Sequence, residues 1–100
     1  MITEITNANS INSGNVIVDF YTKTCGPCRA LHPVLEEISN EFRNIMVTKV
    51  EVTQNPDLSQ QFGVMSVPTV IFMKDSQVKH VERGFSTKEN FRSTVRRVYG

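Results

Sequence analysis

The chain has 100 residues, of which 39% are hydrophobic and 21% charged, the proportions of one small globular domain with a single core. Its formal net charge of +1 creates no strong field that would attract nucleic acid, so nucleic-acid binding is not expected. No apolar run could cross a membrane and no export signal opens the chain, so we expect residues 1–100 to form one cytoplasmic domain.

The first part of the chain predicts two strands and a long helix. Residues 2–6 alternate apolar and polar side chains, and residues 16–21 are a nearly continuous β-branched and aromatic run, typical of a strand covered on both faces. From Cys28 to Phe42 apolar residues recur at spacings of four, three and four, which places them on one face of a helix. Pro33 should kink this helix without ending it, because the apolar stripe continues beyond it.

The middle of the chain predicts a strand over residues 45–52 and a short helix over residues 55–63. Asn55 can cap the first turn of that helix, and Pro56 suits its first helical position. Gly63 suits a left-handed exit from the helix. This short helix is therefore expected to connect the strand at residues 45–52 to the next strand along the chain.

The last third predicts a β-hairpin and a final helix. Strands over residues 67–73 and 78–83 are separated by the turn formers KDSQ, so they should pair antiparallel. The segment STKE at residues 86–89 has the spacing of a capping box that opens a helix, and Arg96 and Arg97 suit the negative end of that helix. Because strand-helix-strand units are parallel and right-handed, we predict an α/β fold with a central mixed sheet of four to five strands and helices on both faces.

Both cysteines of the chain lie at the junction between the strand at residues 16–21 and the long helix. Cys25 should stand at the helix N-terminus, where free amide groups and the helix dipole favour a thiolate. Cys28, one turn further on, should be more covered yet close enough to form a disulfide. This asymmetry predicts Cys25 as the attacking nucleophile and Cys28 as the resolving thiol. Gly26 would allow close approach by another chain, and Pro27 would stiffen the loop.

Two other uses of the cysteines remain open from the residue pattern. They could be buried core thiols, because free cysteine is often a core residue. They could belong to a zinc site, because His32 follows Cys28 by four residues and His80 could supply a fourth ligand. Pro33 and the lack of a second Cys-x-x-C motif disfavour zinc. A purely structural disulfide is also disfavoured, because so short a loop constrains the unfolded chain little.

Several segments outside the cysteine pair match a known pattern at similar spacing. They are VDFY at residues 18–21, CGPCR at residues 25–29, Pro33, Lys49, NP at residues 55–56, FGVMSVPT at residues 62–69 and RGFS at residues 83–86. From about residue 16 to residue 98 the chain thus resembles the thioredoxin family. The resemblance implies the thioredoxin fold and a thiol-disulfide oxidoreductase that reduces protein disulfides by dithiol-disulfide exchange at Cys25 and Cys28. It implies no cofactor beyond that redox-active disulfide and no metal.

The resemblance also implies roles for residues outside the motif. Asp19 would be a buried acid beneath the resolving cysteine that relays protons, with Lys49 as its partner, because a carboxylate in an apolar strand is costly unless paired or protonated. Pro68 would follow a cis peptide bond and face the disulfide, where a substrate strand would pair with the adjoining backbone. The implied substrate-binding residues are Gly26, Pro27, Val67, Pro68 and Gly84.

Simpler alternatives exist for these residues, and the chain departs from the family pattern nearby. Asp19 could reach solvent at a strand edge, Lys49 could be an ordinary exposed lysine, and Pro68 could be a trans proline that begins an edge strand. Thr24 stands where the family usually has a tryptophan, Tyr21 where it often has another, and the chain contains no Trp. We expect the chemistry to survive, because neither tryptophan is a nucleophile or a proton carrier.

The resemblance implies disulfide-containing substrate proteins and a thioredoxin reductase as partners, with the chain acting as a monomer. The Gly-Pro pair between the cysteines resembles the reducing branch of the family, whereas isomerases and periplasmic oxidants carry a histidine there. The alternative function is a thioredoxin-like binding scaffold, or a subunit of a larger complex, in which the dithiol is incidental.

Overall fold

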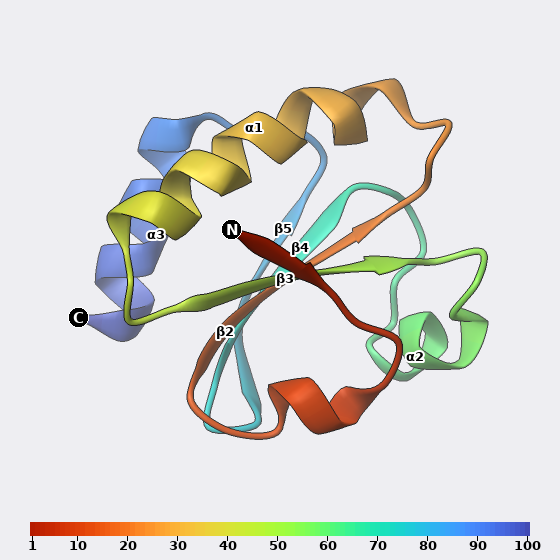
Figure 1. The fold of residues 1–100 in the computed structure, drawn as a ribbon, viewed down its shortest axis with the longest axis horizontal. Helices are drawn as coiled ribbons and strands as arrows, with labels where there is room; N and C mark the ends of the chain where they lie inside the picture. The colour runs from red at the N-terminus through yellow and green to blue at the C-terminus, as the bar shows by residue number, and fades with distance from the viewer.

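Five strands pair into one mixed sheet in the computed structural model, which describes residues 1–100 (Figure 1). The strands are β1 (Ile2–Glu4), β2 (Asn15–Tyr21), β3 (Met46–Glu51), β4 (Thr69–Lys74) and β5 (Gln77–Arg83). Their order across the sheet is β1-β3-β2-β4-β5. β3 pairs parallel with β1 and β2, whereas β4 pairs antiparallel with β2 and β5. The predicted mixed sheet is therefore confirmed.

Helices cover both faces of this sheet, as the sequence predicts (Figure 1). They are the 3-10 helix η1 (Ala8–Ile11) and the α-helices α1 (Gly26–Glu41), α2 (Pro56–Gln61) and α3 (Lys88–Tyr99). α1 and α3 share one apolar cluster on one face, and η1 and α2 share another on the opposite face. None of these helices combines the length and the apolar character that crossing a membrane requires.

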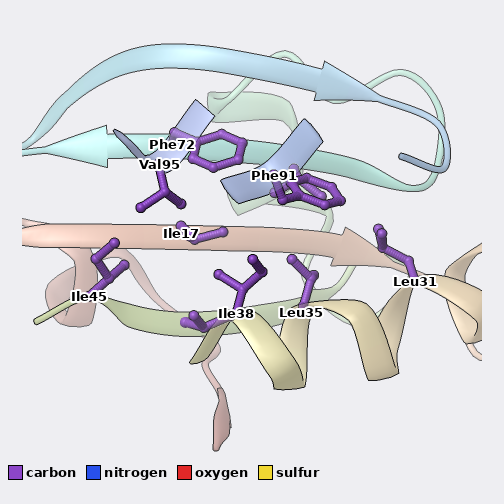
Figure 2. Close-up of a cluster of buried hydrophobic side chains, with 10 residues drawn as sticks. Ile17, Leu31, Leu35, Ile38, Ile45, Phe72, Phe91 and Val95 are labelled. Atoms are coloured by element: carbon purple, nitrogen blue, oxygen red, sulfur yellow. The ribbon is translucent and has the colours of Figure 1, made fainter. Parts of the chain in front are cut away.

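The apolar stripe predicted from the sequence is the inner face of α1. Leu31, Leu35 and Ile38 are completely buried and belong to one cluster with Ile17 of β2 and Phe91 of α3 (Figure 2). Burial of each such side chain stabilises the fold by about 1.5–3 kcal/mol. The helix continues through its internal proline, as predicted. This packing fixes α1 on the sheet, and with it the helix N-terminus that carries the cysteines.

β2 is buried on both faces, which explains its nearly continuous apolar sequence. Side chains alternate along a strand, so Ile17 and Asp19 point toward the α1 face while their neighbours point the other way. The neighbours Val16, Val18 and Phe20 belong to the cluster on the opposite face, together with Ile11 of η1 and Leu58 of α2. The alternation thus places one carboxyl group under the N-terminus of α1.

Two helix caps differ from the prediction. Asn55 occupies the N-cap position of α2, but its Nδ2 donates to the Glu51 carbonyl at 2.9 Å and its side chain caps no amide. The cap of α3 is Thr87 and not Ser86, because Thr87 Oγ1 accepts from the Asn90 amide at 3.1 Å. Ser86 is buried, and its Oγ accepts instead from Asn90 Nδ2 at 3.1 Å. The capping box is therefore replaced by a single cap one residue later.

The hydroxyl of Tyr99 fastens the end of α3 to the sheet. It lies 3.0 Å from the Val16 carbonyl oxygen and 2.9 Å from that of Met73, which are paired residues of β2 and β4. Burial raises the pKa of Tyr99, so the hydroxyl stays a donor.

We expect Tyr99→Phe to lower the free energy of unfolding by about 1 kcal/mol, measured by urea denaturation, with disulfide-exchange activity unchanged. An unaltered unfolding midpoint would show that this contact does not stabilise the fold.

Candidate functional site

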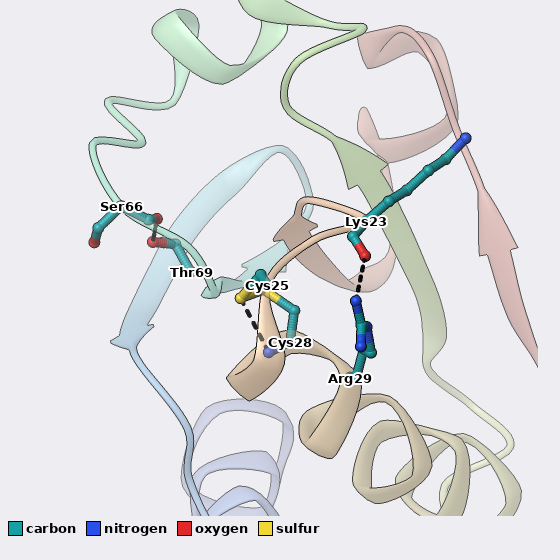
Figure 3. The surroundings of a disulfide bond; sticks show 6 residues. All are labelled: Lys23, Cys25, Cys28, Arg29, Ser66 and Thr69. Atoms are coloured by element: carbon teal, nitrogen blue, oxygen red, sulfur yellow. Dashed lines mark hydrogen bonds between the residues drawn. A yellow bond between two sulfur atoms is a disulfide. The ribbon is translucent and has the colours of Figure 1, made fainter.

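Cys25 and Cys28 form a disulfide at the N-terminal end of α1 (Figure 3). Their Cα atoms are 5.2 Å apart. Cys25 is the N-cap residue, as predicted, and its Sγ accepts a hydrogen bond from the Cys28 backbone amide at 3.1 Å. Pro27 lies in the first turn, where its missing N–H removes no helix hydrogen bond. The local geometry therefore aims a helix N-terminus at the sulfur of Cys25.

The two sulfurs differ in exposure. Cys28 is 4% exposed and lies on the inner side of α1, whereas Cys25 is partly exposed at the helix end. Negative charge on Cys25 would be stabilised by the unpaired amides of the first turn and by the helix dipole. The predicted asymmetry of cover is confirmed, so another protein can reach Cys25 while Cys28 is shielded.

The turn at residues 66–69 lies beside the disulfide (Figure 3). The Val67–Pro68 peptide bond is cis, as predicted, and β4 begins immediately after it. Thr69 Oγ1 donates to the Ser66 carbonyl at 2.7 Å, which holds the turn closed. Neither the amide nor the carbonyl of Val67 has a hydrogen-bond partner within the chain. The backbone amide and carbonyl of Val67 are therefore free to form hydrogen bonds with another chain next to the disulfide.

A second loop is fastened to the same turn. The Gly84 amide donates to the Pro68 carbonyl at 2.8 Å, which joins the end of β5 to the cis-proline turn. Gly84 has a φ of +83°, a conformation that favours glycine over residues with a Cβ. On the other side of the disulfide, Arg29 Nη2 donates to the Lys23 carbonyl at 3.3 Å and ties the preceding loop to α1 (Figure 3). The backbone around the cysteines is thus braced from both sides.

Asp19 shares a pocket of about 260 Å³ with Cys28. It is 2% exposed, which rules out a strand-edge residue that reaches solvent, and its Oδ1 has no hydrogen-bond partner. Burial raises the pKa of Asp19 to about 7; the nearby Lys49 charge lowers it and the Glu4 charge raises it further. The residues that line the pocket are Asp19, Tyr21, Thr22, Lys23, Cys28, Arg29, His32 and Lys49.

Lys49 is the neighbour of Asp19 across the β2-β3 pairing. Its ion pair, however, is with Glu4 of β1, at 3.8 Å between Nζ and Oε1, and its Nζ lies 5.6 Å from the centre of the Tyr21 ring. Lys49 therefore acts on Asp19 through its charge across the pocket. Sequence reasoning missed Glu4, because the only signal was its place in a short alternating segment.

The two alternative uses of the cysteines find no support in the geometry. Both thiols are joined in the disulfide, so neither is a free core thiol. His32 lies beside Glu36 at 3.9 Å, and His80 pairs with Glu82 at 3.0 Å on β5. No three His, Cys, Asp or Glu side chains are grouped so that they could hold a metal ion. The zinc interpretation therefore lacks a ligand set.

Comparison with known proteins decides the family. The family model described as Thioredoxin matches residues 3–97. This chain belongs to the thioredoxin family. The thioredoxin of Chlamydia muridarum is 44% identical over 82 residues, which cover 82% of this chain and 78% of that protein. The thioredoxin of Listeria monocytogenes is 38% identical over 99 residues, which cover 95% of this chain and 96% of that protein.

Solved structures of thioredoxins share the fold. A point mutant of a thioredoxin from Halobacterium salinarum superimposes with a TM-score of 0.90 at 24% identity, covering 96% of this chain and 88% of that one. Mitochondrial thioredoxin 3 from Saccharomyces cerevisiae superimposes with a TM-score of 0.87 at 24% identity, covering 97% and 95%. With the closely spaced pair Cys25 and Cys28, membership of the thioredoxin family makes the chain a thiol-disulfide oxidoreductase.

Proposed function

We propose that this thiol-disulfide oxidoreductase works as a protein disulfide reductase, with Cys25 as nucleophile and Cys28 as resolving thiol. The observation that carries the proposal is the disulfide at the N-terminus of α1, in which Cys25 is partly exposed and Cys28 is only 4% exposed. The Gly-Pro pair between the cysteines supports the reducing direction.

The proposed reaction has two thiol-disulfide exchanges. The Cys25 thiolate attacks a substrate disulfide, so that a Cys25-substrate disulfide forms while the other substrate sulfur leaves as a thiolate. Cys28 then loses its proton and attacks the Cys25 sulfur, which forms the internal disulfide and releases the second substrate thiolate. Two electrons pass to the substrate, and the enzyme dithiol is oxidised to the disulfide.

Asp19 is proposed as the proton relay of the second exchange. It shares a pocket with Cys28, and a pKa of about 7 lets its carboxylate accept the Cys28 proton near neutral pH. Lys49 is proposed as its electrostatic partner, because the ammonium charge favours the ionised carboxylate.

Substrate is proposed to bind over the cysteine loop and the cis-proline turn. The unpaired amide and carbonyl of Val67 can pair with an extended segment of the substrate, as strands do when they add to a sheet edge. Thr24 is exposed and small, which reduces the contact area beside Cys25. The proposed contact residues are Gly26, Pro27, Val67, Pro68 and Gly84.

Disulfide-containing proteins are the proposed substrates, and a thioredoxin reductase is the proposed electron source. A cytoplasmic setting suits a dithiol that must be kept reduced between turnovers. The chain is proposed to act as a monomer, because one chain supplies the cysteine pair, the acid in the pocket and the open backbone.

The test is insulin reduction with dithiothreitol as electron source, together with the reduction potential of the cysteine pair. The protein should accelerate insulin reduction, and the double variant Cys25→Ser/Cys28→Ser should not. The potential should lie closer to roughly −270 mV than to about −120 mV. A potential near the oxidising value would contradict the reductase direction. Full cellular function of the double variant would favour the scaffold alternative.

A further inference from the structure

A second carboxylate, that of Glu4, is ion-paired with Lys49, which lines the Asp19 pocket. We propose that Glu4 is a positioning residue for the resolving step. Its ion pair holds the Lys49 ammonium in place and partly neutralises the charge of that ammonium. Lys49 therefore favours the ionised form of Asp19 less strongly than it would alone. The inference rests on the proposed relay function of Asp19. Glu4 itself touches neither the cysteines nor the substrate in this scheme.

The sheet order places Lys49 between the two carboxylates. Glu4 is paired with Lys49 across β1-β3, and Lys49 is paired with Asp19 across β3-β2. Paired side chains of neighbouring strands project from the same face, and each strand spacing is about 4.8 Å. Glu4 and Asp19 therefore flank the lysine from opposite sides, on the face that α1 covers.

The contacts show which carboxylate holds the lysine. Lys49 Nζ lies 3.8 Å from Glu4 Oε1, and the only ion pair that Lys49 makes is this one. The Glu4 side chain is 45% exposed to solvent, whereas Asp19 is 2% exposed. An ion pair between Lys49 and the exposed Glu4 costs less desolvation than an ion pair between Lys49 and the buried Asp19.

Tyr21 holds the Glu4 carboxylate through hydrogen bonds. Its hydroxyl donates to Glu4 at 2.8 Å to Oε1 and 3.0 Å to Oε2. Burial and the hydrogen bond to Glu4 raise the pKa of Tyr21, so the hydroxyl keeps its proton and remains the donor. The Tyr21 ring also lines the Asp19 pocket, and Lys49 lies over that ring. Glu4, Tyr21 and Lys49 thus form one connected cluster.

Two charges shift the pKa of Asp19, and other charged groups line its pocket. The pKa of Asp19 responds to burial first, then to Lys49, which lowers it, and to Glu4, which raises it. β4 presents only Val70 beside Asp19, and Glu82 of β5 lies beyond that residue. The other titratable or charged groups that face the pocket are Cys28, Arg29 and His32 of α1, Lys23 of the preceding loop and Tyr21 of β2. Removal of the Glu4 charge would leave Lys49 without its ion-pair partner.

The first experiment measures the Asp19 pKa by carbon NMR titration of the oxidised protein. Glu4→Gln keeps an oxygen acceptor for Tyr21 and removes the charge. It should lower the Asp19 pKa by roughly 0.5 unit, as expected for one partly screened charge about two strand spacings away. Lys49→Gln should raise it, and Glu4→Gln should have a smaller effect in that background. Asp57→Asn, an exposed carboxylate on α2 across the sheet, is the matched control and should leave it unchanged.

The second experiment measures the resolving step itself. Reduced protein is mixed with a coloured aryl disulfide, and the second of two thiolate releases reports the attack by Cys28. The pH profile of that release should move to lower pH by the same amount in Glu4→Gln. An Asp19 pKa that shifts no more in Glu4→Gln than in Asp57→Asn overturns the inference and leaves the relay proposal standing. A shifted Asp19 pKa with an unmoved release profile overturns the relay, and the role of Glu4 with it.

Discussion

Cys25→Ser should reduce insulin disulfides at least about a thousandfold more slowly than the unaltered protein, because a serine hydroxyl is not ionised at neutral pH and is a poor nucleophile toward sulfur. The substitution separates chemistry from folding. Cys25 is the N-cap of α1, and serine is among the residues that cap helices best. The urea unfolding midpoint of reduced Cys25→Ser should therefore stay close to that of the reduced parent.

Cys28→Ser should fail at the other exchange. The exposed Cys25 can still attack a substrate, but no second thiol is present to release it, so a covalent protein-substrate disulfide should accumulate. Mass spectrometry under non-reducing conditions checks this directly. If Cys25→Ser formed the adduct and Cys28→Ser turned over normally, the two roles would have to be exchanged.

Asp19→Asn should stabilise the oxidised protein above neutral pH by several kcal/mol, at most about 4 kcal/mol. The carboxyl has a pKa of about 7 in the folded protein and 3.8 as an unperturbed group. Between these values the unfolded chain releases its proton while the folded protein retains it. Stability of the parent therefore falls as pH rises from about 4 to 7 and levels off above 7. An asparagine amide does not titrate, so the variant escapes this loss.

Urea denaturation of both proteins at pH 5 and pH 8 checks the sign. The stability difference between Asp19→Asn and the parent should be larger at pH 8 than at pH 5. Equal differences at the two pH values would show that Asp19 is not held protonated by burial.

Asp19→Asn should also slow the second thiol-disulfide exchange, in which Cys28 attacks Cys25, and flatten the pH dependence of that exchange, because the variant lacks the carboxylate that accepts the Cys28 proton. Asp57→Asn again serves as the control for a lost exposed carboxylate.

Features with local causes could be predicted from the sequence. The strand β2 follows from a continuous β-branched run, and the inner face of α1 follows from apolar residues at helical spacing. The position of Cys25 at the helix start follows from the same boundary. Each depends on residues within a few positions of one another, where the backbone periods of 2 and 3.6 govern which side chains share a face.

Features that depend on distant strands could not be predicted. The pairing of Lys49 with Glu4 requires the parallel register of β1 and β3, which two short runs of sequence do not define. The register between β4 and β5 also shifts between Phe72 and Met73. No residue type in either strand predicts this irregularity. The cap at Thr87 likewise depends on how deeply its neighbour is buried.

The open backbone at Val67 contrasts with the way the sheet is closed elsewhere. β1 spans only Ile2–Glu4, and the outer strand β5 is irregular and carries charged residues such as Lys79 and Glu82. Short, irregular and charged outer strands discourage unwanted edge-to-edge aggregation. An extended segment of a proposed substrate can therefore pair with the backbone beside the disulfide, whereas the outer strands of the sheet discourage the same pairing.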